Sequence, residues 1–195
     1  MELGTLTKVT AATAAEVGRR AGLGEEAQAL LTETMAPAQF LDLLIKREQY
    51  ADAVRFLAHA LPKREAVWWA CLCARGGLPE DAKPPVIEAL KAAEAWVLKP
   101  VEETRRAAMA CAEAAGFDSP SSWAAVGAFW SGGSMAPPDA PPVPPGEELT
   151  GTAVAGAVML AAVQTEPERA EEKFRRFLMQ GIDIANGGSG KGARV

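Results

Sequence analysis

The chain has 195 residues, of which 49% are hydrophobic and 23% are charged, and these values suit one globular domain with a proper core. Its 20 Lys and Arg residues against 25 Asp and Glu residues give a net charge of -5, which argues against nucleic-acid binding because that function needs a basic face. The longest hydrophobic run, residues 153–163, is too short for a bilayer that needs about 20 residues. The N-terminus also lacks the basic and apolar regions of an export signal. We therefore expect a soluble cytoplasmic protein with no membrane insertion.

The first sixty residues contain four stretches whose apolar side chains recur with helical spacing. Residues 10–21 and 25–35 predict two short helices, and Gly18 weakens the first. A leading proline and an apolar stripe predict a surface helix over residues 37–49. Residues 50–61 show the clearest period in the chain and predict an amphipathic helix.

His59, the only histidine of the chain, falls on the polar side of the fourth stretch together with Asp52 and Arg55. A single histidine cannot build a metal site without partners, and no partner is visible in its helix. We interpret Arg55 and His59 as solvent-exposed neighbours one helical turn apart. No metal site and no cofactor are predicted.

Two later stretches, residues 67–74 and 152–163, are hydrophobic all the way round. Such helices lie at the centre of a fold or are shared with a partner. Trp68 and Trp69 point about 100° apart on a helix, so they cannot fill the same pocket. Core packing is favoured for these residues, and Trp69 is kept as a candidate for protein binding.

Proline and glycine delimit the remaining helices, which we predict over residues 62–75, 84–98, 100–115, 119–130 and 166–185. Arg105 and Arg106 follow two acidic residues in the third of these, so we interpret them as a solvated charge pair. The glycine-rich end of the chain resembles a phosphate-binding loop only superficially, because that motif would need a glycine at Ala185 and a hydroxyl at Gly192. We predict an all-α domain of about eight or nine helices over residues 1–186, followed by a disordered tail over residues 187–195.

The stretch over residues 129–149 interrupts the helical pattern. Two aromatic residues run into a Ser-Gly-Gly-Ser segment, and six of the nine residues in 137–145 are proline, so neither half suits a helix interior. An extended proline run at about 3.1 Å per residue would reach roughly 30 Å. We therefore predict a long surface crossover to the opposite end of the domain, after which the next helix runs parallel to the helix of Trp123. A plain crossover is favoured over a binding role.

No combination of residues indicates catalysis. Paired acids such as Glu102 and Glu103 fall at helix starts or on exposed faces, where nothing raises their pKa for acid–base work. No serine lies in a nucleophile elbow. Cys71, Cys73 and Cys111 are interpreted as small buried hydrophobic residues, because their spacing suits neither a disulfide nor a metal site. We predict that the protein is not an enzyme.

Four segments carry a resemblance to a known family: LPKREAVWWACLCAR (61–75), AAEAWVLKPVEETRRAAMACAEAAGF (92–117), AFWSGGSMAPP (128–138) and TAVAGAVMLAAV (152–163). The chain resembles an uncharacterised bacterial family that is often encoded among type VI secretion genes, near spike and accessory components. The likeness covers roughly residues 61–185, and residues 1–60 and the tail fall outside it. It implies a cellular setting and assigns no site residue.

Three hypotheses for the function follow. The leading one is a non-enzymatic accessory, adaptor or chaperone-like protein that binds a spike, tip or effector component of a type VI secretion system. An alternative is a small-molecule enzyme or binder with a pocket between helices near Trp130, and a third is a structural subunit. The sequence specifies neither the partner nor the oligomeric state. The candidate protein-binding residues are Trp69, Phe129, Trp130, Gly132 and Gly133.

Overall fold

A computed structural model describes residues 3–192, and in that part of the chain it contains ten α-helices, one turn of 3-10 helix and no strand. The predicted all-α class is confirmed. The number of helices is slightly larger than the predicted eight or nine. No helix within residues 3–192 is long and apolar enough to cross a membrane.

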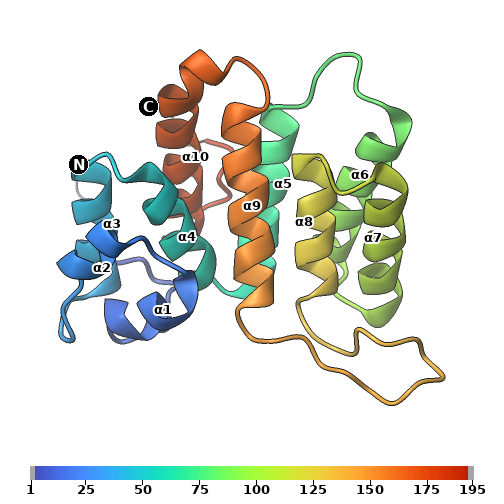
Figure 1. Ribbon diagram of the computed structural model, residues 1–195, viewed down its shortest axis with the longest axis horizontal. Coiled ribbons are helices and arrows are strands. Elements are labelled where there is room, and N and C mark those ends of the chain that lie inside the picture. Colours follow the sequence, from blue (N-terminus) through green and yellow to red (C-terminus); the bar gives the residue numbers. More distant parts are fainter. Residues whose placement is uncertain (1–2, 193–195) are drawn as a thin grey trace.

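The first four helices form a unit that we call the N-terminal lobe (Figure 1). Thr13 caps the first helix by accepting a hydrogen bond from the amide of Glu16 at 3.4 Å, and proline occupies the first position of the third. The lobe consists of α1 (Ala14–Ala21), α2 (Glu25–Leu30), α3 (Pro37–Lys46) and α4 (Tyr50–Ala60).

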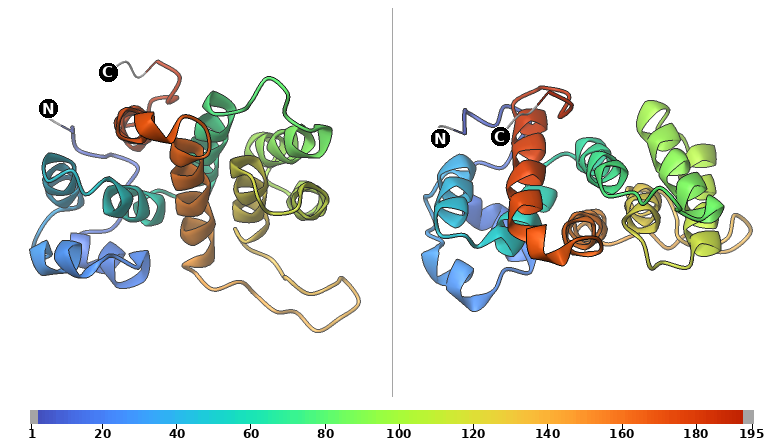
Figure 2. Two further views of the ribbon diagram at one scale, coloured as in Figure 1. Left: turned by 45° about the horizontal axis from the view of Figure 1, so that its top comes forward. Right: turned by 90° about the horizontal axis from the view of Figure 1, so that it is seen from above.

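The remaining helices pack beside this lobe, and α9 lies between the lobe and α8 (Figure 1). The two views of Figure 2 show α9 and α10 with the lobe on one side and α6, α7 and α8 on the other. These helices are α5 (Lys63–Gly76), α6 (Pro84–Leu98), α7 (Glu102–Ala115), α8 (Pro120–Phe129), α9 (Leu149–Val163) and α10 (Ala170–Ala185), with the 3-10 turn at Pro167–Arg169.

The centre of the fold is built on small side chains. α9 packs against α4, α5 and α8, and its residues Ala153, Val154 and Ala157 are fully buried. A Cβ atom built on Gly127 of α8 would lie 3.4 Å from Val154 and 3.5 Å from Val67 of α5. Helices with such small contact residues approach closely, which places the two all-apolar stretches at the centre.

Trp69 is a core residue, so its place among the predicted protein-binding residues is wrong. Its side chain has no exposed surface, and its Nε1 donates a hydrogen bond to the carbonyl of Phe177 at 2.7 Å. A Cβ atom built on Gly181 of α10 would lie 2.8 Å from the Trp69 ring. The indole therefore fills the space between α5 and α10. Trp68 is the partly exposed member of the pair.

His59 is buried, so the prediction of a solvent-exposed histidine is wrong. Its exposed fraction is 7%, and its Nδ1 lies 2.8 Å from the carbonyl oxygen of Arg55. The start of α9 covers the ring, because a Cβ atom built on Gly151 would lie 2.5 Å from it. The polar face of α4 is thus covered by a helix that comes some ninety residues later in the chain.

The predicted crossover between α8 and α9 is also wrong. The two helices are antiparallel neighbours, and the intervening segment leaves and re-enters the bundle at the same end (Figure 1). The segment folds back on itself, since the amide of Met135 donates to the carbonyl of Val143 at 2.8 Å. The proline run therefore projects away from the domain and returns to it.

The tail was predicted to be disordered over residues 187–195. Its first part contacts the domain: the amide of Gly190 donates to Asp183 Oδ2 at 2.8 Å, and the carbonyl of Ser189 accepts from Trp68 Nε1 at 2.9 Å. Residues 193–195 lie outside the described residues, so the prediction is not tested there.

Candidate functional site: the proline-rich loop

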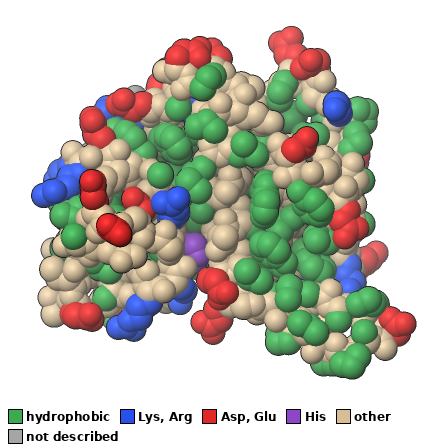
Figure 3. Space-filling view, viewed as in Figure 1, with side chains coloured by type: hydrophobic (Ala, Val, Ile, Leu, Met, Phe, Trp, Pro, Cys, Tyr) green, Lys and Arg blue, Asp and Glu red, His purple; other side chains and the backbone are tan. Residues whose placement is uncertain are grey.

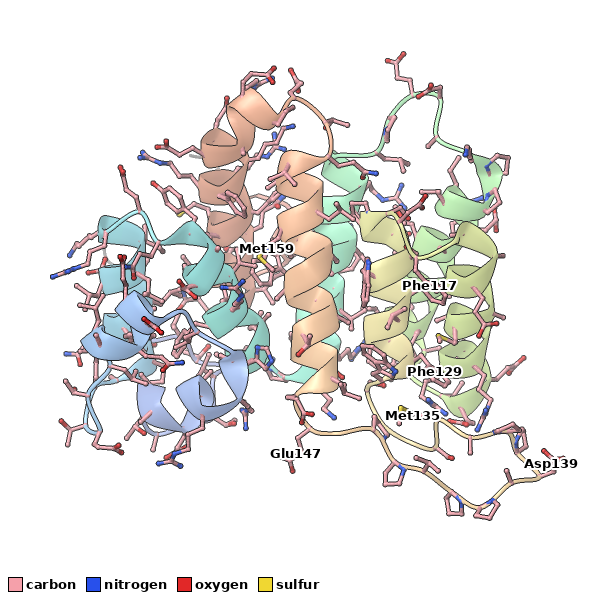
Figure 4. The ribbon with its side chains drawn as sticks, viewed as in Figure 1. Phe117, Phe129, Met135, Asp139, Glu147 and Met159 are labelled. Atoms are coloured by element: carbon pink, nitrogen blue, oxygen red, sulfur yellow. The ribbon has the colours of Figure 1, made fainter. Side chains whose placement is uncertain are left out.

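The segment over residues 130–148, which we call the proline-rich loop, projects from one end of the bundle (Figure 1). Antiparallel helices in bundles are usually joined by about two to eight residues, so joining α8 to α9 does not require a segment of this length. Figure 4 shows Asp139 at the far tip, whereas Phe129 and Glu147 lie where the loop meets the helices. Topology alone therefore does not explain the loop.

A buried arginine fixes the base of the loop. Arg105 of α7 is only 4% exposed, and it donates to the carbonyls of Phe129 at 2.6 Å and Ser134 at 2.8 Å. Its guanidinium carbon also lies 4.5 Å from the centre of the Phe129 ring. A buried charge is tolerated only when it is paired and hydrogen-bonded, and the loop carbonyls supply part of that requirement.

Glu102 completes the charge balance at this base. Its two carboxylate oxygens accept from Arg105 Nε at 2.6 Å and Nη2 at 2.8 Å, and one of them also accepts from Arg106 Nε at 2.6 Å. The hydrogen bonds from Arg105, followed by the one from Arg106, hold the pKa of Glu102 at about 2. The carboxylate is therefore ionised at any neutral or mildly acidic pH, and the ion pairs persist over that range.

Arg106 reaches further along the loop. Its Nη2 donates to the carbonyls of Ala136 at 3.0 Å and Ser134 at 3.3 Å. The interpretation of Arg105 and Arg106 as a merely solvated pair is wrong, because together they bind three carbonyls between Phe129 and Ala136. The local sequence shows only the acids one turn earlier, so it gives no signal for these contacts.

Ser134 joins the two limbs of the loop. Its Oγ accepts from the amides of Ala136 at 3.1 Å and Val143 at 3.0 Å, beside the hydrogen bond between Met135 and Val143. At the tip, the amide of Ala140 donates to the carbonyl of Pro137 at 3.1 Å and closes a turn. Proline also restricts the backbone φ angle. The loop therefore has a defined conformation well away from the helices.

Two further bonds tie the loop to neighbouring helices. Lys63 Nζ of α5 donates to the carbonyl of Ser131 at 3.0 Å. Thr150 Oγ1 of α9 donates to the carbonyl of Trp130 at 2.9 Å. Helices α5, α7 and α9 thus all hold the base, while five prolines beyond it are exposed: Pro137, Pro138, Pro141, Pro142 and Pro144.

Four of the five predicted binding residues, all except Trp69, lie together at the base of the loop. Phe129 is 6% exposed beneath Arg105, and Trp130 is partly exposed and packs edge to face on Trp123 with ring centres 6.4 Å apart. Gly133 has a φ of +65°, and a Cβ atom there would lie 3.0 Å from both Arg105 and Glu102. Gly132 has open space where a side chain would lie.

Hydrophobic side chains gather on the surface next to the loop. In Figure 3 they cover much of the right half of the molecule and continue onto the loop at the lower right. The exposed members include Phe117 at 39% and Val143 at 49%. This surface adjoins the exposed prolines and suits contact with another protein.

A metal cluster and a reactive thiol are two common sources of chemistry in proteins. Within residues 3–192 no three His, Cys, Asp or Glu residues are placed to hold a metal ion. Cys71 and Cys73 are fully buried, and burial raises the pKa of both thiols. They are therefore protonated and weakly nucleophilic at neutral pH.

Comparison with known proteins places the chain in a family. A family of unknown function, DUF6931, matches residues 40–185, and the chain belongs to it. The match begins about twenty residues before the resemblance inferred from the sequence segments, so it includes most of α3 and all of α4. Neither the curated proteins nor the solved structures contain a match.

Proposed function

We propose that this member of the family is a non-enzymatic accessory or adaptor protein that binds a protein partner through the proline-rich loop. The observation that carries the proposal is a loop fixed at its base by buried Arg105 while its prolines are exposed. Because α8 and α9 are antiparallel neighbours, the length of the loop is not used to cross the domain. Ordered loops longer than a connection needs are usually functional.

The loop suits a partner with an aromatic-lined groove. Prolines three residues apart, as at Pro138 and Pro141 or Pro141 and Pro144, are the spacing that such grooves bind in an extended proline helix. Within the described residues, the carbonyls of Pro141 and Pro142 accept no hydrogen bond from the protein, so they are free to accept bonds from a partner. A loop that is already ordered loses little conformational entropy on binding.

The resemblance of the sequence to proteins encoded among type VI secretion genes supports a cellular setting for this role. In this proposal the protein acts in the cytoplasm as an adaptor or chaperone-like factor, and its partner is a spike, tip or effector component. The loop would hold that component before or during assembly.

A pull-down from the native host tests the proposal. The tagged full-length protein is compared with a loop variant, Pro141→Ala/Pro142→Ala/Pro144→Ala, and with a matched control, Pro84→Ala/Pro85→Ala, which changes exposed prolines at the start of α6. Mass spectrometry should recover a spike, tip or effector protein with the wild type and the control. The loop variant should recover about tenfold less, as for loss of a binding hot spot.

Two outcomes would overturn the proposal. One is that the wild type recovers no secretion component. The other is that the loop variant recovers as much of that component as the wild type, which would mean that the prolines do not make the contact. Circular dichroism of each variant checks that the helices are intact.

A further inference from the structure

Two adjoining hollows lie along α9 on a side of the molecule away from the tip of the loop. The first, of about 330 Å³, is lined by Arg20, His59, Lys63, Glu147 and Thr150 among others. The second, of about 380 Å³, shares Arg20 and His59 and continues along α9. Because the same two residues line both hollows, we treat them as one feature, the α9 groove. The purple histidine in Figure 3 lies at the bottom of this groove, between the N-terminal lobe and the centre of the molecule.

The two ends of the α9 groove differ in chemistry. The first hollow contains cationic and hydroxyl side chains beside the N-terminus of α9. The second exposes more apolar surface, to which Trp123, Ala155, Gly156 and Met159 contribute, although Arg20, Arg55, His59 and Thr152 also line it. From Thr150 to Met159 the helix rises by about 13 Å, so the groove offers a polar end and an apolar end within the length of a small molecule.

Unpaired cations concentrate at the polar end. Arg20 Nη2 donates to the carbonyl of His59 at 3.2 Å, and Lys63 donates to the carbonyl of Ser131. Neither forms an ion pair within residues 3–192. Arg55 is already paired with Asp52 at 3.1 Å. Two carboxylates, Glu147 in the lining and Glu148 beside it, oppose this positive charge, and both are exposed, as Arg20 is. The first turn of α9 adds partial positive charge, and no side chain caps it.

His59 provides an independent sign that something is bound here. The residue is more than nine-tenths buried, yet its Nε2 makes no hydrogen bond of good geometry among the described residues, although the backbone of Glu148 lies near the ring. Buried polar atoms are nearly always paired, and an exception requires an explanation. The ring also forms part of the wall of both hollows. Because Nδ1 donates to the carbonyl of Arg55, Nε2 of the neutral ring is an acceptor. An anion in the groove would become its partner when the ring takes up a second proton and shifts slightly.

We propose that the α9 groove binds a small amphipathic anion. Its carboxylate or phosphate head lies between Arg20 and Lys63 beside the start of α9, and its apolar body lies over Gly156 towards Trp123 and Met159. The charge of the polar end selects an anion, and the apolar end excludes a fully hydrated one. This binding requires neither the loop prolines nor a protein partner.

Gly156 offers a way to block the groove without disturbing the fold. A Cβ atom built there meets no atom within 4 Å, so Gly156→Leu places its side chain in open space within the apolar hollow. Leucine also favours a helix more than glycine does, so the variant should fold. A second matched pair is Arg20→Ala against Arg19→Ala, since Arg19 is the neighbouring residue on α1 and does not line either hollow.

Titration calorimetry of the full-length protein with four probes tests the proposal. Octanoate and octyl phosphate carry both a charge and an apolar body, octanol lacks the charge, and acetate lacks the body. We expect saturable binding of octanoate, octyl phosphate or both, and which of them binds identifies the head. Octanol and acetate should bind at least about tenfold more weakly. Gly156→Leu and Arg20→Ala should lower the affinity about tenfold or more, whereas Arg19→Ala should leave it unchanged.

The single histidine gives a second readout. Its imidazole signals in a nitrogen-15 NMR spectrum need no assignment, and they should move when octanoate or octyl phosphate is added. Burial and Arg20 lower the pKa of His59 in the free protein. A bound anion should raise this pKa. The other charged groups around the ring are Arg55, Lys63, Glu147 and Glu148.

Three results would overturn the proposal. The first is that neither amphipathic probe binds saturably to the wild type. The second is that Gly156→Leu binds the probes as tightly as the wild type does, and the third is that Arg20→Ala does so. The loop variant Pro141→Ala/Pro142→Ala/Pro144→Ala should bind the probes as the wild type does, so the outcome is separate from that of the protein-partner test.

Discussion

Replacing Arg105 with methionine tests whether one buried guanidinium holds the proline-rich loop in place. Methionine keeps much of the apolar stem but removes the hydrogen bonds to the carbonyls of Phe129 and Ser134. Such charge-assisted bonds contribute about 1.5–3 kcal/mol each. Ser134 keeps a bond from Arg106, and water can solvate Glu102, whose side chain is 54% exposed. We therefore expect the free energy of unfolding to fall by about 2–4 kcal/mol.

Urea unfolding measures this loss, and amide hydrogen exchange locates it. The amides of Met135 and Val143, which are bonded across the two limbs, should exchange faster in Arg105→Met, whereas helix content should be unchanged. Arg106→Met is the control, because its partly exposed side chain should contribute about 1 kcal/mol or less. Surface substitutions typically change the free energy of unfolding by no more than about 0.5 kcal/mol. A loss of that size in Arg105→Met, together with unchanged exchange at both amides, would refute the role assigned to Arg105.

Three further predictions concern other parts of the structure. Gly133→Ala should lower the free energy of unfolding by roughly 1–2 kcal/mol in thermal melts, because φ is +65° there, and Gly132→Ala should cost less. Burial lowers the pKa of His59 in the folded protein below its usual 6.5, so the unfolded chain binds the proton more readily. The free energy of unfolding should therefore fall as the pH decreases through 6.5 towards the folded-state pKa. Urea unfolding between about pH 7.5 and 5.5 should show this loss in the wild type, and His59→Gln should show less of it. Gly181→Ala should destabilise by about 1–3 kcal/mol by crowding Trp69, and a neutral effect in urea unfolding would contradict the packing described there.

Much of the fold follows from local chemistry, which a sequence displays directly. Pro84 and Pro120 begin α6 and α8 as predicted, since a helix loses nothing from proline at its first position. Ser119 caps α8 by accepting from the amide of Ser122 at 3.2 Å, as its place before Pro120 predicts. Gly116 ends α7 in a left-handed conformation. Each of these signals acts within four residues, so tertiary context does not change it.

The errors concern contacts between residues far apart in the chain. The hydrophobic pattern of α9 is nearly uniform around the helix, so it specifies burial but not direction. In the antiparallel order, Gly127 of α8 packs against Val154 of α9, a contact that the pattern of neither helix specifies. Similarly, His59 is exposed or buried according to whether a later helix covers α4. Arg105 is exposed or buried according to whether Phe129 lies over α7. A polar residue on a helix face indicates solvent only when no other element covers that face.

The loop and the α9 groove meet at a few residues, and this contact decides which substitutions can separate the two proposals. Lys63 holds the carbonyl of Ser131 and also lines the groove. Thr150 likewise bonds to the base of the loop and lines the same hollow. An anion that draws Lys63 away from Ser131 would loosen the loop, and by linkage a partner that fixes the loop would then weaken binding of the anion. Substitutions at Lys63 or Thr150 therefore perturb both features. The exposed prolines and Gly156 each touch one feature alone, so they are the positions at which the two functions are tested independently.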